Sequence, residues 1–105
     1  MTTALVEQTV VFLSTSTSID VNAILADSRV QNWFTNSQGA DGLVSVADFE
    51  HYNGNGTYTS NPLARIDVIV SAAFASSMLL DIPGLRTSFP QFTIATWGSN
   101  VAFGT

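Results

Sequence analysis

The sequence of 105 residues contains no cysteine and no lysine, and its only basic residues with a permanent charge are Arg29, Arg65 and Arg86. Without cysteine there can be no disulfide, no thiolate nucleophile and no cysteine-ligated zinc or iron–sulfur site. Without lysine there can be no Schiff-base lysine and no P-loop lysine on a phosphate. These absences exclude enzymes that depend on a cysteine nucleophile, a Schiff-base lysine or a P-loop lysine. Without cysteine, the sequence also gives no indication of the redox compartment.

Charge of either sign is scarce. Charged residues make up 10% of the chain, where about 25% is usual for a globular domain, and the net charge is −5. Binding to a nucleic-acid backbone needs clustered cations, so we expect no nucleic-acid partner. A surface with so few charges on a small chain predicts that much of it is covered by neighbouring protein, either copies of the same chain or other subunits.

We expect neither a membrane span nor an export signal in this chain. The uncharged run between Asp67 and Asp81 is shorter than the ~20 residues of a membrane span and is interrupted by serines. The N-terminus has no basic region of the kind that opens a secretory signal. We therefore expect no membrane contact, and a location in the cytoplasm of the producing cell or in a virion.

The longest apolar segment predicts a central helix over residues 62–81. Asn61 can cap it, Pro62 suits its first position, and Pro83 with Gly84 can stop it. Apolar residues occur on all of its faces, which is typical of a helix surrounded by others. The expected fold is mainly α, a single domain over 1–105 with four to five helices around this one.

Two further segments allow more than one interpretation. Residues 2–14 fit both a strand and a helical stripe, and we favour the helix slightly. The alternative fold is α+β, with strands near 5–13 and 91–97. Residues 19–36 predict a helix whose apolar face changes side, so we expect a break near Asp27 and a second helix capped by Asp27.

Residues 44–53 predict another short helix. Ser45 and Asp48 have the spacing of a capping box, and Val44 and Phe49 have the spacing of a hydrophobic staple. Both patterns place the helix start at Val46, and Asn53 with Gly54 would end it.

The segment 37–48 has some features of a calcium-binding helix-loop-helix. Aligned on Gly42, it would offer Ser37, Asp41 and Asp48 as oxygen ligands. Gly39 lacks a ligating side chain, so we favour a capped turn that binds no metal, and we expect no cofactor. His51, the only histidine, is better explained as a solvated residue than as a general base. No nucleophile elbow or phosphate loop accompanies it, so we expect no enzyme.

The C-terminal segment is rich in apolar residues and almost free of charge. We expect a docking arm at 98–105, and an interface that includes Phe92, Trp97, Val101 and Phe103. The function that these patterns favour is a non-catalytic structural subunit of a larger assembly, such as a phage head or tail component. The alternative is a small module that binds calcium or a peptide through residues 37–48. An enzyme centred on His51 comes last.

Overall fold

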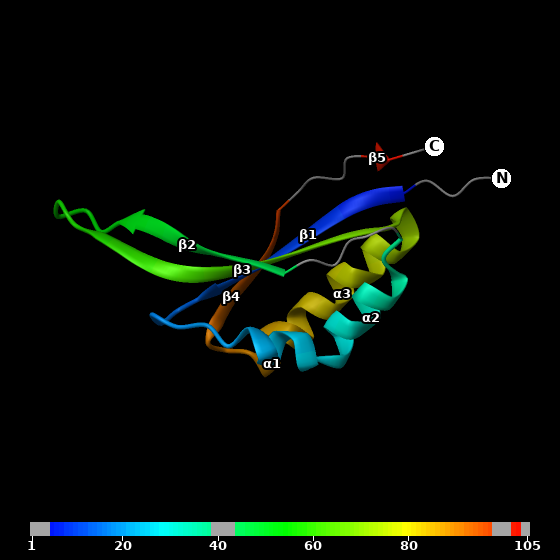
Figure 1. The fold of residues 1–105 in the computed structure, drawn as a ribbon, viewed down its shortest axis with the longest axis horizontal. Coiled ribbons are helices and arrows are strands. Elements are labelled where there is room, and N and C mark those ends of the chain that lie inside the picture. The colour runs from blue at the N-terminus through cyan, green and yellow to red at the C-terminus, as the bar shows by residue number, and fades with distance from the viewer. Residues whose placement is uncertain (1–4, 39–43, 98–101, 104–105) are drawn as a thin grey trace.

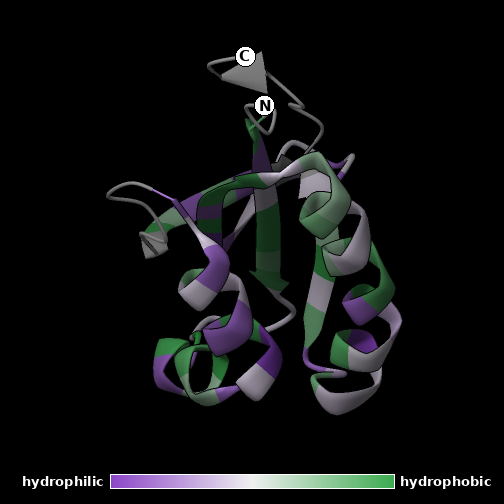
Figure 2. Cartoon of the chain, turned by 90° about the vertical axis from the view of Figure 1, so that its right-hand side faces the viewer, coloured by the Kyte–Doolittle hydropathy of each residue, from purple (hydrophilic) through white to green (hydrophobic). Residues whose placement is uncertain are grey.

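The computed structural model describes residues 5–38, 44–97 and 102–103, and it shows an α+β fold. In chain order the elements are β1 (Leu5–Ser14), α1 (Val21–Ala26), α2 (Ser28–Asn36), β2 (Val44–Tyr52), β3 (Tyr58–Ser71), α3 (Ala72–Ser88), β4 (Phe92–Trp97) and β5 (Ala102–Phe103). The strands form an antiparallel sheet in the order β2-β3-β1-β4, and the short β5 also pairs with β1. The helices lie on one side of this sheet (Figures 1 and 2).

The mainly α fold expected from the sequence is therefore wrong. The α+β alternative, with strands near 5–13 and 91–97, agrees with β1 and β4. The slight preference for a helix over residues 2–14 fails because this segment is the central strand, paired with β3 on one edge and with β4 on the other.

The expected central helix over 62–81 is half strand and half helix. β3 occupies its first part, and α3 begins at Ala72 with the Ser71 hydroxyl accepting a hydrogen bond from the Phe74 N–H at 3.1 Å. Pro62 is tolerated within β3 because pairing with β1 ends at Leu63, so no bond to β1 needs its N–H. Pro83 and Gly84 lie inside α3 instead of ending it.

One face of the sheet forms the core with the helices. Alternate residues of β3 from Ala64 to Val70 are fully buried, and the register places Val10 beside Ile66 and Phe12 beside Ala64 on the same face. The helices contribute Ile24, Val30, Trp33, Ala75, Met78, Ile82 and Leu85 to this core.

The predicted break in segment 19–36 is confirmed at Asp27. This residue ends α1, and its carboxylate accepts hydrogen bonds from the backbone N–H groups of Arg29 and Val30 at the start of α2. Helix α2 is tied to α3 by the Trp33 indole, which donates to the Asp81 carboxylate at 2.8 Å. The two helices under the sheet are therefore joined by polar contacts as well as by apolar packing.

The expected helix from Val46 to Asn53 is also wrong, because residues 44–52 form strand β2. Each residue from Val44 to Tyr52 pairs with a residue of β3. The capping-box and staple spacings are accidental here: residues i and i+3 or i+5 fit a local helix pattern, but pairing with the longest strand in the chain decides the conformation.

Candidate docking surface

The clearest feature outside the core is a two-stranded arm, residues 48–62, made by the ends of β2 and β3. Pairing of β1 with β3 begins only at Leu63, whereas pairing of β2 with β3 continues out to Tyr52 and Tyr58. The arm therefore extends beyond the rest of the sheet (Figure 1). A two-stranded hairpin by itself is marginally stable in water, so a projecting one of this length calls for an explanation.

The tip of the arm is ordered by its own hydrogen bonds. The Asn53 N–H donates to the Thr57 carbonyl at 2.9 Å, and the Gly56 N–H donates to the Tyr52 hydroxyl at 3.0 Å. Gly54 and Gly56 have φ of 91° and 86°, a backbone region that favours glycine. The rings of Tyr52 and Tyr58 lie 5.2 Å apart across the two strands. This tip is a defined shape that a partner could recognise.

Large apolar side chains are exposed along the arm and at its base. The exposed fractions are 53% for Val46, 40% for Phe49, 57% for Tyr52 and 64% for Tyr58. The helices lie under the body of the sheet and not under the arm (Figure 1). By the register, Val46, Tyr52 and Tyr58 share one face of the two strands and Phe49 lies on the other. Exposed apolar side chains on a projecting element are typical of a protein–protein contact.

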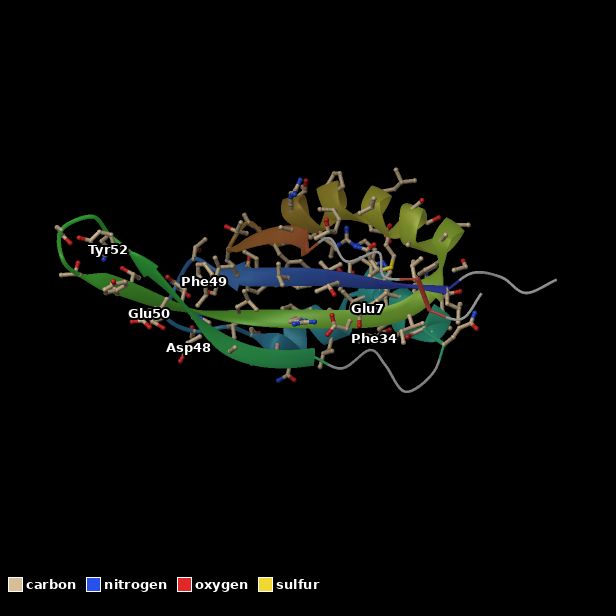
Figure 3. All side chains as sticks on the ribbon, turned by 90° about the horizontal axis from the view of Figure 1, so that it is seen from above. Glu7, Phe34, Asp48, Phe49, Glu50 and Tyr52 are labelled. Atoms are coloured by element: carbon tan, nitrogen blue, oxygen red, sulfur yellow. The ribbon has the colours of Figure 1, made fainter. Side chains whose placement is uncertain are left out.

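The charge of the arm has one sign. Asp48 and Glu50 are exposed on β2, and residues 44–64 contain no arginine or lysine (Figure 3). The three arginines all have partners in the body: Arg29 pairs with Asp27, Arg65 pairs with Asp67, and Arg86 donates to the Ile94 carbonyl. The arm therefore combines aromatic surface with two acidic side chains and contains no arginine or lysine.

The face of the sheet opposite the helices is a second exposed surface, and Figure 3 looks onto it. Arg65 and Asp67 form an ion pair of 2.9 Å here, and the Thr9 hydroxyl donates to Asp67 at 2.5 Å. Thr9 and Val11 are almost fully buried because their neighbours in β3 and β4 flank them on both sides. This face is mixed in polarity and largely satisfied by its own contacts.

A shallow pocket of about 250 Å³ lies between β1 and the first turns of α3. It is lined by Val6, Gln8, Ala72, Ala75, Ser76 and Leu79. Leu79 in this lining is 48% exposed, and Leu80, the next residue of α3, is 80% exposed. The pocket offers an apolar surface but no cluster of groups that could perform chemistry.

Three residues of the expected interface lie in strands that the structure describes. Phe92 is 6% exposed and packs edge-on against Phe12, within the core of this single chain. Trp97 is the last residue of β4, and Phe103 pairs with Leu5 through β5. Val101 lies outside the described residues. The docking role of residues 98–105 stays a prediction, with β5 placed on β1 of the same chain.

The residues of the calcium hypothesis are not brought into a helix-loop-helix. Ser37 ends α2, and its hydroxyl accepts a hydrogen bond from the Ile69 N–H, while Asp48 lies within β2. Asp41 is outside the described residues. His51 lies in β2 opposite Thr59. Within residues 5–38, 44–97 and 102–103, no group of three histidine or acidic residues is arranged to hold a metal ion.

Sequence reasoning missed the arm because it treated residues 46–53 as a helix. The sequence signal that predicts the arm is the turn NGNGT, which follows a segment ending at Tyr52 and precedes a segment beginning at Tyr58. A short loop containing glycines between segments rich in β-branched and aromatic residues is typical of a hairpin.

In the part of the chain that the structure describes, no helix is long and apolar enough to cross a membrane. Comparisons with protein-family models, with curated proteins and with solved structures find no match for this chain.

Proposed function

We propose that this chain is a non-catalytic structural subunit of a larger protein assembly, of the kind found in phage heads and tails. It contacts its neighbours through the arm. The observation that carries the proposal is a projecting two-stranded arm with Phe49, Tyr52 and Tyr58 exposed on it. In an isolated subunit this apolar surface is left in water, whereas in an assembly it is buried and stabilises the contact.

The ordered tip favours a docking role over a simple surface loop. Hydrogen bonds among Asn53, Asn55 and Thr57 hold the turn before any partner arrives. At the base of the arm, the Asn61 side chain donates to the Ser16 carbonyl at 2.9 Å, which ties the arm to the body. A preorganised element loses less conformational entropy on binding, so more of the contact energy appears as affinity.

The test compares the full chain with an arm-deletion variant, in which residues 48–62 are replaced by Asn-Gly. Every residue of β3 that pairs with β1 is kept in this variant. Both forms are tagged and expressed in the cells that naturally produce the protein, and their native size is measured by size-exclusion chromatography of the clarified lysate. We expect the full chain to elute far above its mass of 11.2 kDa, and the variant to elute as a monomer.

Circular dichroism of the purified variant checks that it folds. If the deletion prevents folding, the double substitution Tyr52→Ser and Tyr58→Ser replaces it, with Leu79→Ser and Leu80→Ser as the matched control on α3. A full chain that elutes as a monomer in the lysate refutes the proposal. A complex that is lost only in the α3 control moves the contact to the pocket beside Leu79.

A further inference from the structure

The outer edge of β2 has unused backbone hydrogen-bonding capacity along its whole length, from the sheet to the end of the arm. β2 lies at one end of the strand order, and no strand among the described residues pairs with its outer side. Along such an edge, alternate residues direct N–H and C=O groups outward. These groups can pair with an extended segment of another chain by strand addition.

The side chains of β2 on the two faces of this strand differ in chemistry. By the alternation of the strand, Asp48 and Glu50 share one face with Val46 and Tyr52, and Phe49 lies on the opposite face. A strand added to this edge has its own side chains alternating between the same two faces. Its residues on the Asp48 and Glu50 side meet negative charge, and those on the Phe49 side meet an aromatic ring.

A second copy of this chain is a poor occupant of the edge. If two β2 strands pair about a two-fold axis with the helices of both copies on one face, the acidic residues of both copies share that face. Like charges opposite each other are destabilising in a sheet. The arginines do not compensate this charge, because Arg29, Arg65 and Arg86 all have partners in the body.

We propose that the outer edge of β2 binds an extended segment of a different protein, in which arginine or lysine alternates with apolar residues. The basic residues pair with Asp48 and Glu50, the apolar ones pack on the Phe49 side, and the backbone continues the sheet. This inference rests on the proposed function, since it names the partner chemistry at the same arm. Opposite charges across neighbouring strands add to the backbone hydrogen bonds and fix the register.

Acidic residues on an edge strand can also have a protective role, and the test must distinguish this role from docking. Charged side chains on an exposed edge also prevent unwanted sheet-to-sheet association. A protective charge only repels, whereas a docking edge binds a strand of matching pattern.

The probe is an octapeptide of alternating lysine and valine, acetylated and amidated at its ends. Binding to the full chain is measured by titration calorimetry, and the contacted residues are mapped by backbone amide shifts. The controls are the alternating glutamate–valine peptide, a block peptide with the lysines together, and two copies of the probe N-methylated on one or the other set of alternate residues. We expect binding of the probe alone among the unmethylated peptides, shifts centred on residues 47–52, and loss of binding for one of the two methylated copies.

Matched variants test the charges. Asp48→Asn with Glu50→Gln should weaken the probe at least tenfold. Glu7→Gln with Asp20→Asn removes the same amount of charge away from the arm and should change affinity less than twofold. Equal weakening in both variants means attraction to overall charge only, and it overturns the proposal. The proposal is also overturned if both N-methylated copies bind as well as the unmethylated probe.

The remaining outcomes distinguish this inference from the proposed function. If no peptide binds while the arm deletion still breaks up the native complex, the arm docks in another way and only the strand-addition inference fails. If analytical ultracentrifugation shows a dimer that the tyrosine substitutions dissociate, the occupant is a second copy and the inference is wrong. Aggregation of the Asp48→Asn, Glu50→Gln variant without peptide binding identifies the acids as protective.

Discussion

Asp27 links α2 to α3 through its carboxylate and the neighbouring Arg29. It caps α2, it pairs with Arg29 at 2.8 Å, and Arg29 in turn donates to the Ser88 hydroxyl near the end of α3 at 3.0 Å. The side chain of Asp27 is only 10% exposed, so the ion pair is less screened by solvent than a surface pair. Substitutions of Asp27 can separate the contribution of the helix cap to stability from that of the ion pair.

We expect Asp27→Ala to lower the free energy of unfolding by about 1–2 kcal/mol, because it removes both the cap and the ion pair. Asp27→Asn keeps a good capping side chain and should cost less, about 0.2–1 kcal/mol from the lost charge pair. Urea unfolding at neutral pH measures both. Equal losses in the two variants would mean that the cap contributes nothing.

The same pair predicts an acid dependence of stability. The side-chain hydrogen bond from Arg29 lowers the pKa of Asp27 below its usual value of about 3.9. The folded state therefore holds the proton less tightly than the unfolded state. The stabilisation is fully present above that usual value and is lost as pH falls through the lowered folded pKa. Urea unfolding between neutral pH and about pH 2 should show the gap between wild type and Asp27→Asn closing on the acid side.

Gly84 lies against the same guanidinium. A Cβ built at this position meets Arg29 Nη1 at 2.7 Å, so a larger residue must displace the arginine. Alanine is also the better helix former by roughly 0.5–1 kcal/mol. We expect Gly84→Ala to be close to neutral in wild type and to stabilise by that amount in an Arg29→Ala background. A double-mutant cycle measures the coupling, and an identical effect in both backgrounds would show that the close approach has no energetic consequence.

At the scale of elements, β3 is the strand on which the sheet depends. It pairs with β1 on one side and with β2 on the other, and its alternate residues are fully buried against the helices. Ile66→Ala should therefore cost about 2–5 kcal/mol, the usual range for a fully buried aliphatic side chain.

The control for this loss is Leu80→Ala on α3. Leu80 is 80% exposed, so its truncation should change the free energy of unfolding by less than about 0.5 kcal/mol. Denaturant unfolding of both variants tests the assignment of the core face. A small loss at Ile66 with a large one at Leu80 would mean that the buried and exposed faces have been exchanged.

The sequence predicts some of these elements well and others badly, for physical reasons. Asp27 marks the break between α1 and α2 because a cap is a local signal that does not depend on distant packing. The strand β3 and the helix α3 were merged into one helix because they join at Ser71 without a loop. β-branched residues such as Ile66, Val68 and Val70 favour a strand, but their pairing partners are distant in sequence.

The candidate site was harder to predict than the fold. Low charge predicts a contact surface only as a class, because composition carries no position. The arm is defined by the register, in which β1 pairs with β3 no further than Leu63. Asn61 and Pro62 have the local pattern of a helix start, whereas they lie in β3 at the base of the arm.

At the scale of the whole molecule, the arm makes the chain long. The extents are 56 × 26 × 23 Å and the Cα radius of gyration is 14.9 Å, against about 13 Å for a compact domain of this length. Small-angle scattering should therefore give a lower radius of gyration for the arm deletion, near 12–13 Å if its body is a compact domain. An unchanged radius would place the elongation elsewhere in the molecule.

The body should survive this deletion, since the core residues come from β1, α1, α2, α3, β4 and the part of β3 beyond Leu63, and the arm contributes none of them. We expect a cooperative thermal transition and a helical circular dichroism signal like that of the full chain. Loss of both would mean that the arm is required for folding, and the tyrosine substitutions would then be the better test of assembly.

The continuity of β3 with α3 has a mechanical consequence. One uninterrupted stretch of backbone runs from Tyr58 at the tip of the arm to Ser71, which also caps α3. A pull on the tip along the strand direction loads the hydrogen bonds between β3 and β1 in shear, so that several must break together instead of opening one at a time. A neighbouring subunit that binds the arm would therefore transmit a pulling force directly to the sheet and to α3.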